Sequence, residues 1–531
     1  MSPLSTEKFD ALVIGSGMGG LAAASFLAQF GGQRVLVLER HFKAGGFTHT
    51  FQRKKWHWDV GLHYVGEMHE KASLRQIFDL ATGGEVKWQK MPDPLEYFVY
   101  PEHRFALPAD PDAYRSALQA AFPQEQKAID TYFKDLQRLI GFFQQYMGCL
   151  ALPTPVGKAL RWLSHKERAF ALQTTGQYLA SRFRDPQLRG VIASQWGDYG
   201  LPPGQSALLI HALIAHHYLR GGYYPIGGSG TLAASIEKQI KAQGGEIRVC
   251  QEVSEILIEG SKAVGVRVRD LRSHDQPEYT LKAPRIVSDA GVWNTYLRLM
   301  PPETTSYASG IREFFSQTPA VSALTLYLGF ESSPRDLGYQ GENYWLYPSY
   351  DHDRNFASRH QWLHLEQAQP PMAYLSFPSL KDPLAQAHTG EIITVSEASD
   401  FKNWEKSAWK KRGKDYETLK AELSERLLNY VEGYCPGLKA KVAFSELSTP
   451  LSNAWFTAHP QGMIYGAAAI PERFKTELTP WHQPRTPIPG LYLTGADAGT
   501  LGIGGALAGG LLAATAILGP SKMAPVLKQM R

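Results

Sequence analysis

The chain is poor in cysteine and in excess charge of either sign. Among its 531 residues are three cysteines, Cys149, Cys250 and Cys435, which lie far apart. That spacing gives neither a disulfide framework nor the Cys-x-x-Cys pairs of zinc sites, so we expect a reducing, cytoplasmic environment. The formal net charge of +5, from 55 basic and 50 acidic residues, excludes a protein that coats nucleic acid.

Signals for export or membrane insertion are also weak. The N-terminal residues lack a basic stretch followed by an apolar one, so we expect no secretory signal. Residues 499–519 carry no charge, but seven of these 21 residues are glycine. We interpret the run as a glycine-rich turn and a buried helix, with a transmembrane helix as the alternative. Residues 136–152, followed by Lys158, Arg161 and Trp162, have the pattern of a helix at a membrane interface or inside a substrate domain. Peripheral membrane contact therefore stays open.

The N-terminal segment has the pattern of a dinucleotide-binding unit. Residues 9–14 predict a buried strand, residues 15–20 a turn, residues 21–30 a helix and residues 34–39 a second strand. The turn, Gly-Ser-Gly-Met-Gly-Gly, fits G-x-G-x-x-G, in which glycine lets backbone N–H groups approach a diphosphate at the helix N-terminus. Glu39 ends the second strand, where a carboxylate binds an adenosine ribose and repels a 2′-phosphate. NAD and FAD both remain possible, and NADP is disfavoured.

Later segments predict that this sheet is assembled from separated pieces of chain. A glycine turn and helix follow Tyr224, residues 254–269 alternate like a hairpin, and residues 285–290 and 491–494 have strand patterns. We predict an α/β fold, a doubly wound, Rossmann-like FAD-binding domain with an inserted α+β substrate domain. The expected boundaries are 1–90, 221–300 and 486–531 for the FAD-binding parts, and 91–220 and 301–485 for the substrate domain.

Several motifs resemble a known superfamily. Residues 39–51 (ERHFKAGGFTHTF) and 58–66 (WDVGLHYVG) resemble the extended FAD motif of the amine-oxidase and phytoene-desaturase superfamily, and residues 486–510 resemble its closing flavin motif. Residues 217–230 and 448–466 are most similar to the retinol saturase and prolycopene isomerase branch of these phytoene desaturase-like FAD-dependent oxidoreductases. The closing motif ADAGTLGIGGAL replaces the proline-glycine pattern of plain phytoene desaturases, which also favours that branch.

The resemblance implies FAD as the cofactor. The residues that it assigns to FAD are Gly15, Ser16, Gly17, Gly19, Gly20, Glu39, Arg40, Gly45, Gly46, Phe47, Thr48, Val253, Gly495, Ala496, Asp497, Gly505, Ala506 and Leu507. The first five would hold the diphosphate. The last three would place a helix N-terminus against the pyrimidine edge of the flavin, where reduced flavin carries negative charge.

The resemblance also implies the reaction, which acts on a carbon–carbon double bond of a lipophilic polyene, as retinol saturases do. Saturation needs a hydride from the flavin at one carbon and a proton at the other. His63 and Tyr64, which the family places near the flavin, are our candidate catalytic residues, with His459 and Tyr465 as further candidates for the proton. We expect a hydrophobic small molecule as the binding partner and no nucleic acid.

Other questions stay open at this stage. A second G-x-G-x-x-G after a strand is absent, so electrons would come from the substrate, a transient donor or another protein. The spacing of His211, His216 and His217 does not fit one helical face, so we expect no metal site. The alternatives are a carotenoid isomerase or desaturase, a desaturase or reductase of long acyl chains, and an amine oxidase. A flavin-free prenyl-lipid escort protein is an alternative of another class, which Glu39 and the closing flavin motif disfavour.

Overall fold

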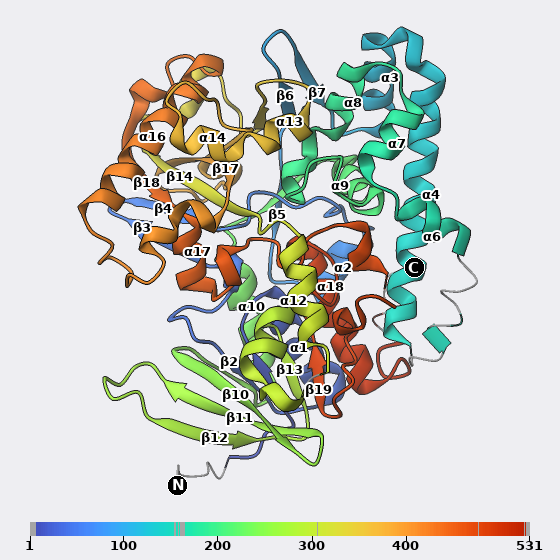
Figure 1. Ribbon diagram of the computed structural model, residues 1–531, viewed down its shortest axis with the longest axis vertical. Coiled ribbons are helices and arrows are strands. Elements are labelled where there is room, and N and C mark those ends of the chain that lie inside the picture. Colours follow the sequence, from blue (N-terminus) through green and yellow to red (C-terminus); the bar gives the residue numbers. More distant parts are fainter. Residues whose placement is uncertain are drawn as a thin grey trace.

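A five-stranded parallel sheet forms the lower part of the molecule in Figure 1. The computed structural model describes residues 7–152, 156–157, 159, 165–304, 306–475, 477–524 and 526. The strand order is β19-β13-β1-β2-β9, and all four pairings are parallel. The strands are β1 (Ala11–Ile14), β2 (Val35–Leu38), β9 (Glu246–Arg248), β13 (Ile286–Ser288) and β19 (Leu491–Leu493). With β1 at the centre, this is the doubly wound order, and the predicted fold class is confirmed.

Several helices cover this sheet, and two of them, α1 (Met18–Gly31) and α18 (Gly502–Leu518), are rich in small residues. Two others are α2 (Ser73–Thr82) and α10 (Gly230–Ala242). A Cβ on Gly510 of α18 would lie 2.6 Å from the Ala22 Cβ of α1, so glycine lets the two helices pack almost backbone to backbone. Helix α18 is largely buried, in agreement with the interpretation of residues 499–519 as a glycine-rich turn and helix. Among the described helices, none combines the length and the apolar character needed to cross a bilayer.

A seven-stranded mixed sheet forms the core of the insert, in the upper part of Figure 1. Its order is β18-β14-β17-β16-β15-β6-β7. The strands are β6 (Glu96–Val99), β7 (Arg104–Leu107), β14 (Ser322–Phe330), β15 (Asn343–Leu346), β16 (Ala373–Ser376), β17 (His388–Ser396) and β18 (Val442–Ser448). The pairing of β15 with β6 is parallel and the others are antiparallel. All seven strands fall within residues 91–220 and 301–485, whereas the strands of the parallel sheet fall within the other three segments.

Helices flank this second sheet on both sides in Figure 1. They include α3 (Pro111–Ala121), α4 (Gln126–Ala151), α6 (His165–Ala171), α7 (Thr175–Arg182), α8 (Pro186–Ala193), α9 (Leu208–Tyr218), α13 (His352–Ala357), α14 (Arg359–His364), α15 (Pro378–Lys381), α16 (Lys414–Tyr434) and α17 (Pro450–Thr457). Helix α12 (Ala308–Gln317) lies in the lower part of the molecule instead, where Ile311 and Phe314 pack in the core of the parallel sheet. Helix α4 contains the predicted helical residues 136–151, and Lys158, Arg161 and Trp162 lie outside the described residues.

Smaller sheets complete the fold. Strands β10 (Gln251–Glu259), β11 (Lys262–Asp270) and β12 (Glu278–Lys282) form an antiparallel sheet at the bottom of Figure 1, where a hairpin was expected. The pair β3 (Thr50–Arg53) and β4 (Trp56–Asp59) and the pair β5 (Trp88–Lys90) and β8 (Tyr223–Pro225) form two-stranded sheets. The β3–β4 hairpin packs Trp56 and Trp58 on Tyr327 of β14, and thereby ties the two larger sheets together.

Candidate cofactor and substrate cavity

A cavity of about 1310 Å³ runs from the glycine turn of the parallel sheet to the seven-stranded sheet. Its walls include Gly17 and Gly19 at one end, Trp345 and Tyr374 at the other, and residues of α18 between them. A drug-sized ligand fills roughly 300–1000 Å³. The cavity is therefore large enough for a dinucleotide and a second, elongated molecule.

At the glycine turn the backbone itself forms the wall. Gly15, Gly17, Gly19, Gly45 and Gly46 all line the cavity. A Cβ on Gly46 would lie 2.9 Å from the Gly17 Cα, so the two glycine segments approach each other in a way that side chains would prevent. Gly17, the N-cap of α1, has no side chain, and the Asp289 carboxyl group takes the N–H groups of Gly17 and Gly20, which leaves those of Met18 and Gly19 for an anion. This cradle fits a diphosphate.

The acid after the second strand is held by the turn. The Glu39 Oε2 atom accepts hydrogen bonds from the Ser16 N–H at 2.9 Å and the Ser16 hydroxyl at 2.7 Å, and Oε1 accepts from the His41 N–H at 2.7 Å. Ser16 thus orients Glu39 with its side chain. A carboxylate has about four lone-pair directions, so Glu39 keeps acceptor capacity for a ribose in the cavity.

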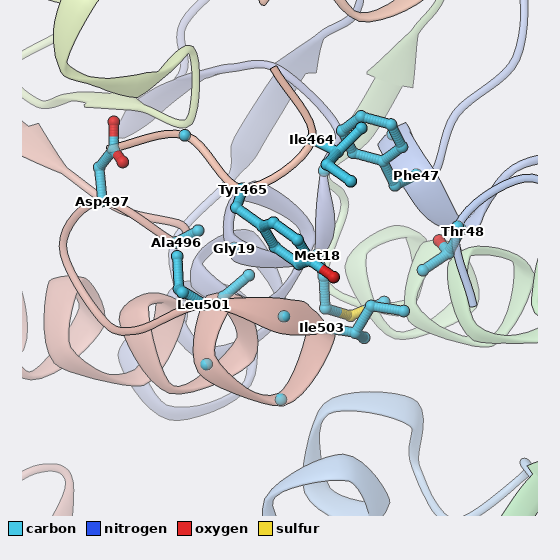
Figure 2. A pocket seen from close by; sticks show the side chains of 18 of the residues that line it. Met18, Gly19, Phe47, Thr48, Ile464, Tyr465, Ala496, Asp497, Leu501 and Ile503 are labelled. Atoms are coloured by element: carbon cyan, nitrogen blue, oxygen red, sulfur yellow. The ribbon is translucent and has the colours of Figure 1, made fainter. Parts of the chain in front are cut away.

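The other predicted contacts to the adenosine half also lie on the wall. Arg40 forms an ion pair with Glu252 at 3.4 Å and donates to the Trp455 carbonyl at 2.9 Å, so its guanidinium is held at this end. Val253 of β10 lines the same region. Phe47 and Thr48 follow in the 3-10 turn η1 (Gly46–Thr48), which contacts α1 and α10, and both line the cavity (Figure 2).

Asp289 is a buried acid at the glycine turn that sequence reasoning missed. It follows β13, and a Cβ on Gly17 would lie 2.5 Å from its Oδ2. Burial raises the pKa of Asp289 to about 8, although N–H groups of Gly20 and Gly17 lower it. A neutral carboxyl group here keeps negative charge away from the cradle. An acid at the carboxyl end of a parallel strand, beside the glycine turn, was the signal that could have revealed it.

The closing motif supplies a second helix N-terminus to the cavity. Leu501 precedes α18 without a side-chain cap, and Gly505 and Ala506 of its first turns line the cavity. Such a terminus carries partial positive charge and stabilises negative charge nearby. The arrangement fits the pyrimidine edge of a flavin.

Asp497 stabilises the backbone around this motif. Ala496 and Asp497 both line the cavity. The Asp497 side chain points away from the other labelled side chains of Figure 2, and its carboxylate accepts from the Val292 N–H at 2.8 Å and the Ala467 N–H at 2.9 Å. Burial opposes the charged form, but His482 and Arg473 bring the pKa of Asp497 below its usual value. The charged Asp497 therefore fixes the loop that leads into α18.

Four of the residues assigned to FAD do not line the cavity but pack directly behind its wall. Ser16 bonds to Glu39, and Gly20 packs against the Gly15 carbonyl, 2.3 Å from where a Cβ would lie. Gly495 packs on Asp289 in the same manner, and Leu507 is fully buried in the core between α1 and α18. Any contact of these residues with FAD would come through the backbone.

The candidate catalytic residues lie on the aromatic wall. His63 Nδ1 is 2.7 Å from Glu391 Oε1, and the Tyr64 hydroxyl donates to Asp198 Oδ2 at 2.8 Å. Both side chains line the cavity. Their catalytic roles stay predictions, and the structure adds that each is paired with a carboxyl group.

The two further candidates lie nearer to α18. His459 Nδ1 is 2.8 Å from the Met463 carbonyl, so it holds a loop. Tyr465 donates to the Gly197 carbonyl at 2.8 Å, and in Figure 2 its ring points toward Met18 and Ile503, at the starts of α1 and α18. Tyr465 thus connects the flavin-binding end with the aromatic wall.

Comparison with known proteins identifies the class first. Residues 18–518 match the family described as flavin containing amine oxidoreductase, and the chain belongs to this family. Among solved structures, cyclohexylamine oxidase from Brevibacterium oxydans IH-35A has a TM-score of 0.60 at 16% identity, covering 99% of this chain and 100% of that one. That likeness confirms the fold. The glycine cradle, Glu39 and the two helix termini fit FAD, and the protein is an FAD-dependent oxidoreductase.

The branch of the family follows from curated relatives. The chain is 34% identical to "All-trans-retinol 13,14-reductase" of Homo sapiens and 32% identical to that of Danio rerio, in both cases over 96% of this chain and 86% of the relative. It is 26% identical to "Prolycopene isomerase 2, chloroplastic" of an Oncidium hybrid cultivar, over 98% of this chain and 86% of the relative. The chain therefore belongs to the retinol reductase and prolycopene isomerase branch, as its motifs predict.

Proposed function

We propose that the protein uses reduced FAD to saturate a carbon–carbon double bond of a lipophilic polyene. The observation that carries this proposal is the shape of the cavity, which continues past the flavin-binding end into an apolar, aromatic region. Its lining there comprises Ile140, Phe143, Met147, Ile210, Leu213, Ile214, Ala323, Trp345, Met372, Tyr374, Ile393 and Val395. An apolar chain bound there would be out of water along much of its length.

The names of the relatives support the same substrate class. The relatives above 30% identity are described as retinol 13,14-reductases, and retinol is a polyene alcohol. Bound FAD would supply the hydride in such a reaction. The chain itself would hold the polyene, keep water away from the reacting carbons and deliver a proton to the second carbon.

Partners and location belong to the proposal as well. The substrate would be a hydrophobic small molecule taken up in the cytoplasm, with peripheral membrane contact as one route of entry. Electrons would reach the FAD from a separate donor, because the sequence has one dinucleotide motif and the proposal assigns it to FAD.

The test is the visible spectrum of the purified protein. We expect bound flavin, which dithionite bleaches under anaerobic conditions and which all-trans-retinol in detergent restores to the oxidised form. A flavin that stays reduced while the isomer ratio of a carotenoid changes would favour the isomerase. A protein without flavin would contradict the proposal and revive the lipid escort.

A further inference from the structure

A carboxyl group lies on the aromatic wall, next to the flavin-binding end. Asp198 ends the 3-10 turn η3 (Ser194–Asp198) and lines the cavity. The preceding residue, Gly197, accepts the hydrogen bond from Tyr465, whose ring points toward the start of α18 (Figure 2). Asp198 therefore directly follows Gly197, the residue that contacts Tyr465 at the flavin-binding end.

The other carboxyl groups that line the cavity, among the described residues, lie elsewhere or are already bound. They are Glu39 and Glu252 near Arg40, Asp289 at the glycine turn, Asp497 with its two backbone donors, and Glu67, which lies near the charge of Arg220. Asp198 is thus the acid that faces the apolar region where a polyene would bind.

Tyr64 holds Asp198 in place. Its hydroxyl donates to Asp198 Oδ2 at 2.8 Å. The Tyr64 ring is nearly parallel to the rings of Tyr218 and Tyr374, at centroid distances of 4.3 and 6.2 Å, so its position is fixed by stacking. The bond to Tyr64 uses a lone pair of one oxygen, which leaves a carboxylic acid free to donate its own proton.

A second carboxyl group lies behind Asp198. Glu96, the first residue of β6, is fully buried and accepts from Gln195 Nε2 at 3.2 Å. Burial, and then the charge of Glu96, raises the pKa of Asp198 well above its usual value. Burial also raises the pKa of Glu96 to about 7, and Tyr64 is the first of the groups that lower it. Two buried carboxyl groups that interact in this way oppose each other's ionisation.

Apart from Glu96, the titratable groups among the described residues on which the charge of Asp198 acts are tyrosines: Tyr64, Tyr199, Tyr218, Tyr347, Tyr374 and Tyr465. Lys381 is a buried cation of the same network, and its Nζ donates to Asn343 Oδ1 at 2.7 Å. Its charge interacts most with Glu391 and next with Glu96, and Asn343 in turn interacts with Glu96.

We infer that Asp198 is the catalytic acid that donates the proton to the polyene, with Tyr64 and Glu96 as its positioning residues. This inference rests on the proposed function. The two electrons and one hydrogen would come as hydride from bound, reduced FAD to one carbon, and the Asp198 carboxyl proton would go to the other. The π bond would be replaced by two C–H bonds, the flavin would be oxidised, and the Asp198 carboxylate would regain a proton from solvent before the next turnover.

The test compares the Asp198→Asn holoenzyme with the wild type and with Asp135→Asn, a matched change of another buried carboxyl group that accepts from a tyrosine hydroxyl and does not line the cavity. The readout is the rate at which all-trans-retinol reoxidises the dithionite-reduced flavin in a single anaerobic turnover. We expect Asp198→Asn to keep its flavin and its fold and to slow this step by about 100-fold or more, the usual contribution of a general acid. Asp135→Asn should react at nearly the wild-type rate, and Asp198→Glu should restore part of the activity.

Two further readouts separate a proton donor from a structural residue. In the wild type the rate should fall as pH rises through the pKa of Asp198, and Asp198→Asn should lose this dependence. Glu96→Gln removes the charge that keeps Asp198 protonated, so the fall should move to lower pH. In infrared spectra of the oxidised holoenzyme at pH 7, the protonated-carboxyl band should lose intensity in Asp198→Asn and keep it in Asp135→Asn.

The outcomes are distinguishable. A reactive wild type together with an equally fast Asp198→Asn of the same pH dependence would overturn the role of Asp198 and leave the proposed function standing. A wild type whose reduced flavin is not reoxidised by the polyene would overturn the proposed function, and with it the donor role, whatever the infrared band shows.

Discussion

At the nucleotide end of the cavity the chain meets its ligand with backbone, whereas at the aromatic end it presents buried side chains from distant segments. Glycines of two turns and the first N–H groups of α1 form the first end. Tyr64 and Asp198 line the second end, and Glu96 and Lys381 are buried around them; the four come from a loop, a 3-10 turn, a strand and a short helix. The first arrangement depends on local sequence, and the second depends on contacts between distant segments.

The largest effect on cofactor binding is expected at the glycine turn. A Cβ on Gly19 would lie 2.2 Å from the Gly495 Cα, and backbone cannot move aside as a side chain can. We expect Gly19→Ala to purify without flavin and to lose about 1–3 kcal/mol of stability, the cost of overpacking. The measurements are the visible absorbance of the purified protein and urea unfolding.

Gly141→Ala is the matched control. Gly141 lies in α4, and a Cβ there would contact nothing within 4 Å. This variant should keep its flavin and gain up to about 1 kcal/mol from helix propensity. A Gly19→Ala protein that retains flavin as well as Gly141→Ala would show that the close approach of the two segments is not needed.

At the aromatic end the largest effect on stability is expected at Lys381. Its Nζ donates to the His63 carbonyl at 2.9 Å and to Asn343 Oδ1 and Ser376 Oγ at 2.7 Å each, while burial lowers its pKa to about 7. Lys381→Met leaves these acceptors unpaired, and we expect a loss of about 2–4 kcal/mol in urea unfolding.

Lys238→Met is the surface counterpart. Lys238 is 66% exposed and pairs with Glu85 at 2.7 Å, so its loss should cost about 0–1 kcal/mol. Similar costs for the two lysine variants would mean that the buried network contributes no more than a surface ion pair.

Much of the nucleotide end could be predicted from sequence because its determinants are local. The spacing of Gly15, Gly17 and Gly20, and the position of Glu39 after the next strand, identify the site without tertiary information. Asp198 could not be found in this way. It is a single acid between Gly197 and Tyr199, and its meaning depends on Glu96, about a hundred residues earlier, and on Tyr64. Tyr64 was found through the family resemblance, while its partner was missed.

A change at Glu39 tests whether a single side chain contributes to FAD binding at the nucleotide end, where backbone groups form most of the wall. Glu39→Gln keeps the size of the side chain but removes the charge that accepts from Ser16 and His41 and would accept from the ribose. Hydrogen bonds to charged groups contribute about 1.5–3 kcal/mol, so we expect the Kd for FAD to rise about 10-fold to 100-fold. Quenching of flavin fluorescence on titrating apoprotein measures this, and an unchanged Kd would contradict the role of Glu39.

The smallest effect is expected at Asp289, where the change in the free energy of unfolding depends on pH. The pKa of Asp289 is raised from 3.8 to about 8 in the folded protein, so the folded state binds this proton more tightly than the unfolded state between these values. The stability that this proton contributes is fully present below pH 4 and is lost as pH rises through 8. Relative to Asp289→Asn, the wild-type apoprotein should lose about 1–1.5 kcal/mol between pH 6 and pH 7. A constant difference across this range in urea unfolding would show that Asp289 does not titrate as stated.

The central claim, that one cavity joins FAD to a polyene that becomes saturated, is tested most directly by the mass of the product. The reduced holoenzyme is mixed anaerobically with all-trans-retinol for a single turnover, and the retinoid is extracted and analysed by mass spectrometry. The account predicts a product with two more hydrogen atoms than the substrate, formed in proportion to the flavin oxidised. Recovery of retinoid of unchanged mass, with the flavin still reduced, would contradict it.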